Sequence, residues 1–202
     1  MKINYQLELD KTISELTNTP RLLLHACCGP CASYVLEYLS KHFEIDVFYY
    51  NPNIFPREEY EKRGAELSRL IREMPFENPV RLISAPYDSE RYYSAVRGLE
   101  NEREGGARCT PCFELRLGET AKTAALGGYD WFATTLTVSP HKNAELINTI
   151  GLRLAAECGV PYLVSDFKKR EGYKRSIELC REYCVYRQSY CGCEYSLPKS
   201  NA

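Results

Sequence analysis

The sequence predicts a doubly wound α/β domain with a mainly parallel, five-stranded sheet and helices on both faces. The main observation is an alternation of short apolar runs with longer segments of helical character, an order typical of parallel sheets. The length of 202 residues fits one domain with a single sizeable core. No linker long enough to separate two domains occurs, so we expect a single domain over 1–202 with its core over about 20–195.

Each expected element has its own local pattern. Strands are indicated by runs rich in β-branched and aromatic residues, RLLLHA, IDVFYY, VRLIS, YDWFATT and PYLVS, at 21–26, 45–50, 80–84, 129–135 and 161–165. Helices are expected between and after these runs, over 31–42, 56–74, 88–100, 113–127, 140–158 and 172–186. The last helix has an apolar stripe at helical spacing, formed by Tyr173, Ile177, Cys180 and Cys184.

The loops that follow the strands are the expected place for a functional site. In open parallel sheets, ligands bind beyond the carboxyl ends of the strands. The sequences found there are unusual: CCGPC, NPNIFP, APYD, TVSPHKN and SDFKKREGY. We further expect the segment 172–195 to return a Cys-Gly-Cys motif to the same site.

Charge and cysteine usage narrow the class of protein. The formal net charge is −1, so any nucleic-acid contact must come from a local patch. No run of roughly 18 or more apolar residues occurs, and the start MKINYQLELDKTISEL lacks the apolar core of a secretory signal. We therefore expect a cytoplasmic protein with no membrane partner. In that reducing compartment, ten cysteines point to metal binding or catalysis rather than to disulfides.

The first cysteine group is Cys27, Cys28 and Cys31. It leaves an expected strand and enters a helix, where backbone N–H groups and the helix dipole stabilise thiolates. The run from Cys28 to Cys31 has the letters of a thioredoxin active site, so a thiol–disulfide oxidoreductase is one hypothesis. It leaves Cys27 without a role. Buried, inert cysteines are the other alternative.

Two further groups are Cys109 with Cys112 and Cys191 with Cys193. The first is a C-x-x-C pair of a kind that often supplies loop ligands to zinc or iron–sulfur sites. In the second, a glycine between the cysteines lets both sulfurs face one point, as a metal-ligand pair or a redox-active dithiol. A zinc-stabilised nucleotide- or RNA-binding module built on these four cysteines is a second alternative. Counted with the first group, seven cysteines exceed the four thiolates of one tetrahedral or cubane site, which favours a second metal or a redox pair.

Other candidate residues have simpler alternatives. His141 and Lys142 follow Ser139 and Pro140, an expected helix start with Ser139 as its cap. They could donate a proton or pair with a phosphate, or they could form an exposed helix start. Asn51 and Asn53 bracket a proline, and turn formation explains them. Core packing explains the remaining cysteines, Cys158, Cys180 and Cys184.

The stretch 168–187 is locally basic. Its charged residues are Lys168, Lys169, Arg170, Lys174, Arg175, Arg181 and Arg187 against Glu171, Glu178 and Glu182, an excess of four positive charges. With several tyrosines among them, these residues could meet an RNA backbone and an unstacked base. They could equally form a solvated face.

Six ordered motifs resemble those of the cobalamin-independent, iron–sulfur epoxyqueuosine reductases, the QueH family. They are LLLHACCGPCA, FYYNPNIFPREEYEKR, ARCTPCFELRL, TTLTVSPHKN, DFKK with GY and RS, and YCGC, from about residue 20 to 195. The resemblance implies a fold related to adenine-nucleotide α-hydrolase-like (HUP) proteins. It also implies the last step of queuosine biosynthesis, a two-electron deoxygenation of epoxyqueuosine in tRNA.

The resemblance also implies a cofactor and partners. A 4Fe–4S cluster would be held by Cys27, Cys28, Cys109 and Cys112. Beside it, Cys191 and Cys193 would be a redox-active dithiol or ligands of a second iron, with Cys31 as a further candidate ligand. Independently of the resemblance, we include His141 and Lys142 in the catalytic set, because their position after an expected strand favours a functional role. The partners would be tRNA carrying epoxyqueuosine and an electron donor, and a monomer is favoured.

Overall fold

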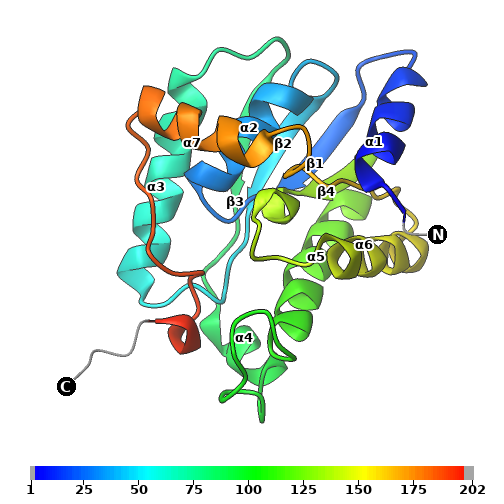
Figure 1. The fold of residues 1–202 in the computed structure, drawn as a ribbon. Coiled ribbons are helices and arrows are strands. Elements are labelled where there is room, and N and C mark those ends of the chain that lie inside the picture. The colour runs from blue at the N-terminus through cyan, green and yellow to red at the C-terminus, as the bar shows by residue number, and fades with distance from the viewer. Residues whose placement is uncertain (1–2, 198–202) are drawn as a thin grey trace.

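Four parallel strands form the central sheet, in the order β3-β2-β1-β4 (Figure 1). They are β1 (Arg21–His25), β2 (Glu44–Tyr49), β3 (Val80–Ser84) and β4 (Trp131–Thr134). A computed structural model describes residues 3–197. At the centre of the sheet, Leu24 lies in register with Val47 on one side and Ala133 on the other, and all three are fully buried. The predicted parallel α/β class is confirmed.

Helices cover both faces of this sheet (Figure 1). The helices are α1 (Tyr5–Ser14), α2 (Gly29–Leu39), α3 (Arg57–Glu73), α4 (Ser89–Ala95), α5 (Cys109–Leu126), α6 (Ala144–Cys158) and α7 (Gly172–Glu182), with 3-10 turns η1 (Thr135–Val138) and η2 (Glu194–Ser196). Alternate residues of β1 point to opposite faces: Leu22 and Leu24 pack in the core with α2 and α3, whereas Leu23 packs in the core with α5 and α6. Helix α7 packs on α2, and α1, which the sequence did not predict, adds Leu9 to the core beneath α2.

The predicted fifth strand at 161–165 is wrong. This segment makes one isolated parallel bridge, between Phe132 and Tyr162. Strand β4 cannot pair further with this segment, because the chain turns from β4 into η1 at Thr135. The backbone of Ser165 is satisfied by a side chain instead: its N–H donates to Asn148 Oδ1 at 3.0 Å, and its carbonyl accepts from Asn148 Nδ2 at 2.8 Å. Within residues 3–197, no helix is long and apolar enough to cross a membrane.

We expect Asn148→Ala to lower the free energy of unfolding by about 1–3 kcal/mol, because it leaves the buried backbone groups of Ser165 without partners. Urea denaturation of both proteins measures the difference. Thr149→Ala is the matched control on the same helix, since the Thr149 side chain is exposed and bonds only to the Glu145 carbonyl. Equal losses in the two variants would contradict this account of the segment.

Candidate functional site

Two adjoining cavities lie at the carboxyl edge of the sheet, where the sequence predicts the site. The larger, of about 510 Å³, is lined by residues that follow β1 and β4, by α7 and by the segment after α7. The smaller, of about 110 Å³, is lined by residues that follow β2, by α4 and α5, and by the C-terminal segment. Four residues line both cavities: Glu104, His141, Lys142 and Cys191. Four of the five predicted loops therefore contribute to one continuous site, whereas APYD, after β3, lines neither cavity.

The first cysteine group lies where β1 passes into α2. Cys28 occupies the N-cap position of α2, with extended backbone, and Cys31 lies in the first turn of that helix. The Sγ atoms of Cys27, Cys28 and Cys31 lie within 4.8 Å of one another, so this group could hold a metal ion. Gln188, which the sequence analysis missed, donates from Nε2 to Cys28 Sγ at 3.0 Å. The hydrogen bond with Cys27 raises the pKa of the buried Cys28 thiol to about 12.

The second group corrects the sequence analysis, because Cys109 and Cys112 do not lie in a loop. They form one edge of the first turn of α5, where residues three apart share a face. Pro111 is tolerated between them because the first turn of a helix has no intrahelical partner for its N–H. The Cys109 Sγ accepts from the backbone N–H of Gly105 at 3.2 Å. Both cysteines line the smaller cavity.

The Cys191–Gly192–Cys193 segment contributes both of its sulfurs to the smaller cavity. Gly192 has a φ of 131°, in the region that side chains avoid, and a Cβ there would lie 3.1 Å from both Arg63 Nη1 and Ile54 Cγ1. The Gly192 carbonyl accepts from the Phe55 N–H at 2.8 Å. Only glycine therefore allows this segment to lie so close to the loop after β2.

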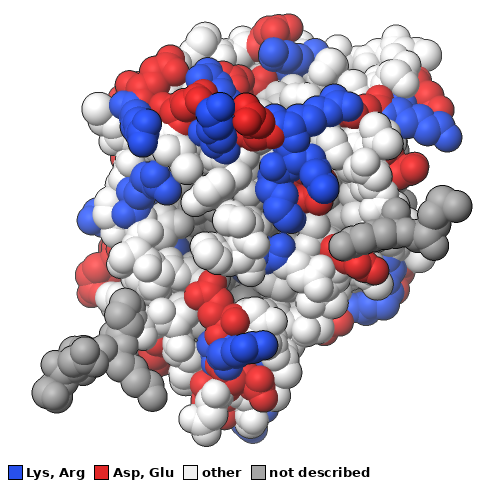
Figure 2. Space-filling model, viewed as in Figure 1, with Lys and Arg blue, Asp and Glu red and all other residues white. Residues whose placement is uncertain are grey.

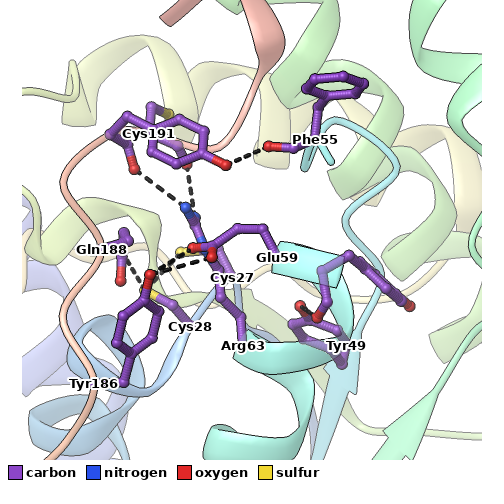
Figure 3. Close-up of polar contacts among 11 residues, drawn as sticks. Cys27, Cys28, Tyr49, Phe55, Glu59, Arg63, Tyr186, Gln188 and Cys191 are labelled. Atoms are coloured by element: carbon purple, nitrogen blue, oxygen red, sulfur yellow. Dashed lines mark hydrogen bonds and ion pairs between the residues drawn. The ribbon is translucent and has the colours of Figure 1, made fainter. Parts of the chain in front are cut away.

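A buried arginine that the sequence analysis missed holds this segment in place (Figure 3). Arg63, on α3, donates from Nη1 to the Cys191 carbonyl at 3.1 Å and from Nη2 to the Tyr190 carbonyl at 3.3 Å. Its Nε donates to Glu59 Oε1 at 2.7 Å, and Tyr186 donates to the same carboxylate (Figure 3). The sequence feature that could have identified Arg63 is its position on the apolar side of α3, in line with Tyr60, Leu67 and Leu70.

The positively charged side chains of Arg116 and Lys142 lie among the thiols. Arg116 has 2% of its surface exposed and donates from Nε to the Cys112 carbonyl at 3.3 Å. Lys142 donates from Nζ toward Cys191 Sγ at 3.7 Å. Burial lowers the pKa of Lys142, but the nearby thiols, Cys191 first, outweigh it and hold the pKa above its usual range. Lys142 is therefore charged in the site, and Arg116 is charged too, because arginine does not deprotonate in proteins.

The turn that carries His141 and Lys142 differs from the prediction. Helix α6 begins at Ala144, and its cap is Asn143, whose Oδ1 accepts from the Leu146 N–H at 3.2 Å. Ser139 is not the cap, because its Oγ accepts from the N–H of His141 at 3.3 Å and only forms a local turn. This turn places His141 and Lys142 on the boundary between the two cavities.

The remaining cysteines lie outside the predicted ligand groups. Cys180 is buried between α7 and α3, as predicted, and also lines the larger cavity. The prediction of core packing is wrong for Cys184. This residue is exposed, because α7 ends at Glu182 and Cys184 therefore does not continue the apolar stripe of the helix. Cys158 is partly buried against the core on the α5 side of the sheet.

Acidic side chains from other elements reduce the predicted positive charge of 168–187. Lys168 pairs with Asp166, Arg170 with Asp10, and Arg175 with Glu37. Figure 2 accordingly shows acidic and basic side chains mixed over the α7 region. Within the described chain, the basic residues of this stretch that form no ion pair are Lys169, Arg181 and Arg187. Arg187 lies on the larger cavity.

The chain is similar to known proteins over most of its length. A family model described as "Epoxyqueuosine reductase QueH" matches residues 22–199. Proteins named epoxyqueuosine reductase QueH from Streptococcus pyogenes serotype M1 and Staphylococcus epidermidis are 44% and 43% identical to this chain, covering 96% and 98% of it and 78% and 86% of their own lengths. A protein of the same name from Thermotoga maritima is 35% identical over 87% of this chain and 90% of its own.

A solved structure resembles the fold. A chain described as a predicted subunit of tRNA methyltransferase from Methanocaldococcus jannaschii superposes with a TM-score of 0.50, covering 80% of this chain and 74% of that one. The sequence identity is 16%, so this likeness bears on the fold alone. It agrees with the parallel α/β arrangement.

We expect Arg63→Met to lower the free energy of unfolding by about 3–5 kcal/mol, because it leaves the largely buried Glu59 carboxylate without its cation. Amide hydrogen exchange in residues 186–193 should also become faster, since two of their carbonyl contacts are lost. Denaturant melts and exchange mass spectrometry measure these effects.

The matched control is Arg57→Met, on the same helix. Arg57 pairs with Glu61 at the same spacing, but both side chains are more than half exposed. We expect a loss of at most about 0.5 kcal/mol from this variant and unchanged exchange in the C-terminal segment. Unchanged exchange in Arg63→Met as well would show that Arg63 does not anchor the segment.

Proposed function

This chain belongs to the epoxyqueuosine reductase QueH family, and we propose that it reduces epoxyqueuosine in tRNA to queuosine at the cysteine-lined cavities. In this reaction the epoxide takes up two electrons and two protons, both of its C–O bonds break, a carbon–carbon double bond forms, and the oxygen leaves as water. The observation that carries the proposal is the convergence of three cysteine groups, far apart in the sequence, on two adjoining cavities. We place the enzyme in the cytoplasm, with its tRNA substrate.

The residues of the site fit a metal–thiolate cofactor. Thiolates are the preferred ligands of iron–sulfur clusters and zinc. Arg116 and Lys142 are buried or half-buried cations that pair with no carboxylate among residues 3–197, an arrangement that is costly unless an anion lies beside them. A metal centre with several thiolates carries the negative charge that these cations would balance.

We assign a 4Fe–4S cluster to Cys27, Cys28, Cys109 and Cys112, and a second iron or a redox-active dithiol to Cys191 and Cys193. When bound, the cluster would supply electrons one at a time from an external donor. Cys31 joins the set as a candidate ligand because its Sγ lies within 4.8 Å of those of Cys27 and Cys28.

The chain's own residues supply binding and proton transfer. The larger cavity, of about 510 Å³, is in the size range of small-molecule sites and can take one nucleobase with its substituent. A modified base reaches such a cavity only when it is unstacked from the RNA, and Tyr173 and Arg187 on the cavity lining can meet its ring and its phosphate. Lys142, charged and beside Cys191, can donate a proton to the leaving oxygen.

The alternatives fare differently against the geometry. A thiol–disulfide oxidoreductase needs an accessible thiolate, whereas Cys28 is 1% exposed and its pKa is raised to about 12 by its hydrogen bond with Cys27. A zinc-stabilised RNA-binding module has one observation in its favour, since Cys109, Cys112, Cys191 and Cys193 all line the smaller cavity. Metal analysis separates that alternative from the reductase.

Strictly anaerobic reconstitution should give more than about four irons and about four acid-labile sulfides per chain, because the thiols exceed the needs of one cubane.

Cys109→Ser or Cys112→Ser should bleach the visible absorption, since each removes a thiolate. Cys180→Ala is the control and should keep the absorption, at a packing cost of about 1 kcal/mol. Stoichiometric zinc without sulfide would rule out the proposed cofactor.

Cys191→Ser and Cys193→Ser should keep a 4Fe–4S spectrum but abolish reduction of epoxyqueuosine in tRNA, because the pair completes the second redox centre. The spectrum and single-turnover product are measured on the same anaerobic samples, with tRNA binding as a control that should not change. Full activity in either variant would remove the pair from the mechanism. Loss of the cubane would instead place the pair among the ligands of the cluster.

A further inference from the structure

We propose that Arg116 is a positioning residue that fixes the negative charge of the thiolate centre and thereby raises the reduction potential of the metal bound there. This inference rests on the proposed function. It concerns a side chain of α5 that lies between the cysteine groups and binds no substrate.

Arg116 is a cation in an apolar place. It lies on the buried side of α5, in line with Phe113, Leu117 and Thr120, and has 2% of its surface exposed. No carboxylate lies within ion-pair distance of it among residues 3–197. A buried guanidinium keeps its charge, because arginine does not deprotonate in proteins. Such a charge needs a compensating anion nearby.

The groups near Arg116 that can carry the compensating negative charge are cysteine thiols, which become thiolates when they bind a metal. Burial lowers the pKa of Arg116, but the nearby cysteines outweigh this effect and hold the pKa above its usual range; they are Cys112 first, then Cys191, Cys27 and Cys109. Its Nη2 has no hydrogen-bond partner in the described chain, although Arg116 lines the smaller cavity. The guanidinium therefore lies on the cavity that is lined by Cys109, Cys112, Cys191 and Cys193, and it has a free donor there.

Asn51 holds the guanidinium in this position. Its Oδ1 accepts from Arg116 Nη1 at 3.4 Å, while its Nδ2 donates to the Ala26 carbonyl at 2.9 Å. The Arg116 Nε is fixed in turn by the Cys112 carbonyl at 3.3 Å. Asn51 is buried, so it does more than form the turn after β2. The contacts tie the cation to the end of β1, just before Cys27, and to the first turn of α5.

A fixed positive charge at this place has a defined electrical effect. Reduction adds a negative charge to a metal–thiolate centre, and a buried cation stabilises that charge more strongly than an exposed one. Removing the cation should therefore lower the reduction potential. It should also disfavour assembly of the centre, since several thiolates must be held close together.

The test compares three variants by redox titration of the reconstituted protein, followed by visible absorption. Arg116→Gln removes the charge, Arg116→Lys keeps it, and Lys122→Gln removes an exposed charge from the same helix. At a fixed potential near the wild-type midpoint, we expect Arg116→Gln to lower the ratio of reduced to oxidised centre at least tenfold, equivalent to 59 mV for one electron. In Arg116→Lys this ratio should stay within threefold of the wild-type ratio, and in Lys122→Gln it should equal the wild-type ratio.

Each outcome bears on the inference. A ratio within threefold of wild type in Arg116→Gln overturns it. If circular dichroism shows that Arg116→Gln folds while metal analysis shows that it binds less iron, the iron content of Arg116→Lys decides. The wild-type amount supports the inference, and an equal depletion overturns it. If Arg116→Gln does not fold, the potential of Arg116→Lys decides: retention supports the inference and a tenfold loss overturns it. A wild-type protein without any iron–sulfur centre overturns the proposed cofactor itself, and this inference with it.

Discussion

The hydrogen bonds from Arg63 to the carbonyls of Tyr190 and Cys191 are the contacts on which the site depends. They join a helix in the first half of the chain to its C-terminal segment, and so bring the last cysteine pair to the edge of the sheet where the others lie. A backbone held by side-chain donors needs no regular secondary structure of its own. The segment can therefore follow the cavity wall, with Gly192 supplying the one conformation that other residues avoid.

Charge compensation is the second constraint on this site. Thiols gathered in an apolar setting resist ionisation, as the burial of Cys112 shows by raising its pKa to about 12. Arg116 and Lys142 oppose that effect because they bring fixed positive charge to the same cavity. The two cations would thus balance the negative charge of the metal–thiolate centre that we propose for this site.

The fold and much of the site could be predicted from the sequence. Parallel strands place their carboxyl ends at one edge, so the loops after β1, β2 and β4 were expected together. The fifth strand failed because hydrogen bonds made by Asn148, not a β-ladder, satisfy the backbone of Ser165. The prediction that Cys109 and Cys112 lie in a loop was wrong, because the proline between them is as compatible with the first turn of a helix as with a loop.

The sequence by itself determined the alternation of strands and helices and the identity of the three cysteine groups, because these depend on local periodicity and spacing. Only the tertiary structure decided which cysteines lie together and which cations accompany them. Arg63, Arg116 and Gln188 are unremarkable in the sequence, since a charged residue on a helix or an amide in a loop is usually solvated. Their roles arise from burial, and burial depends on residues that are far away along the chain.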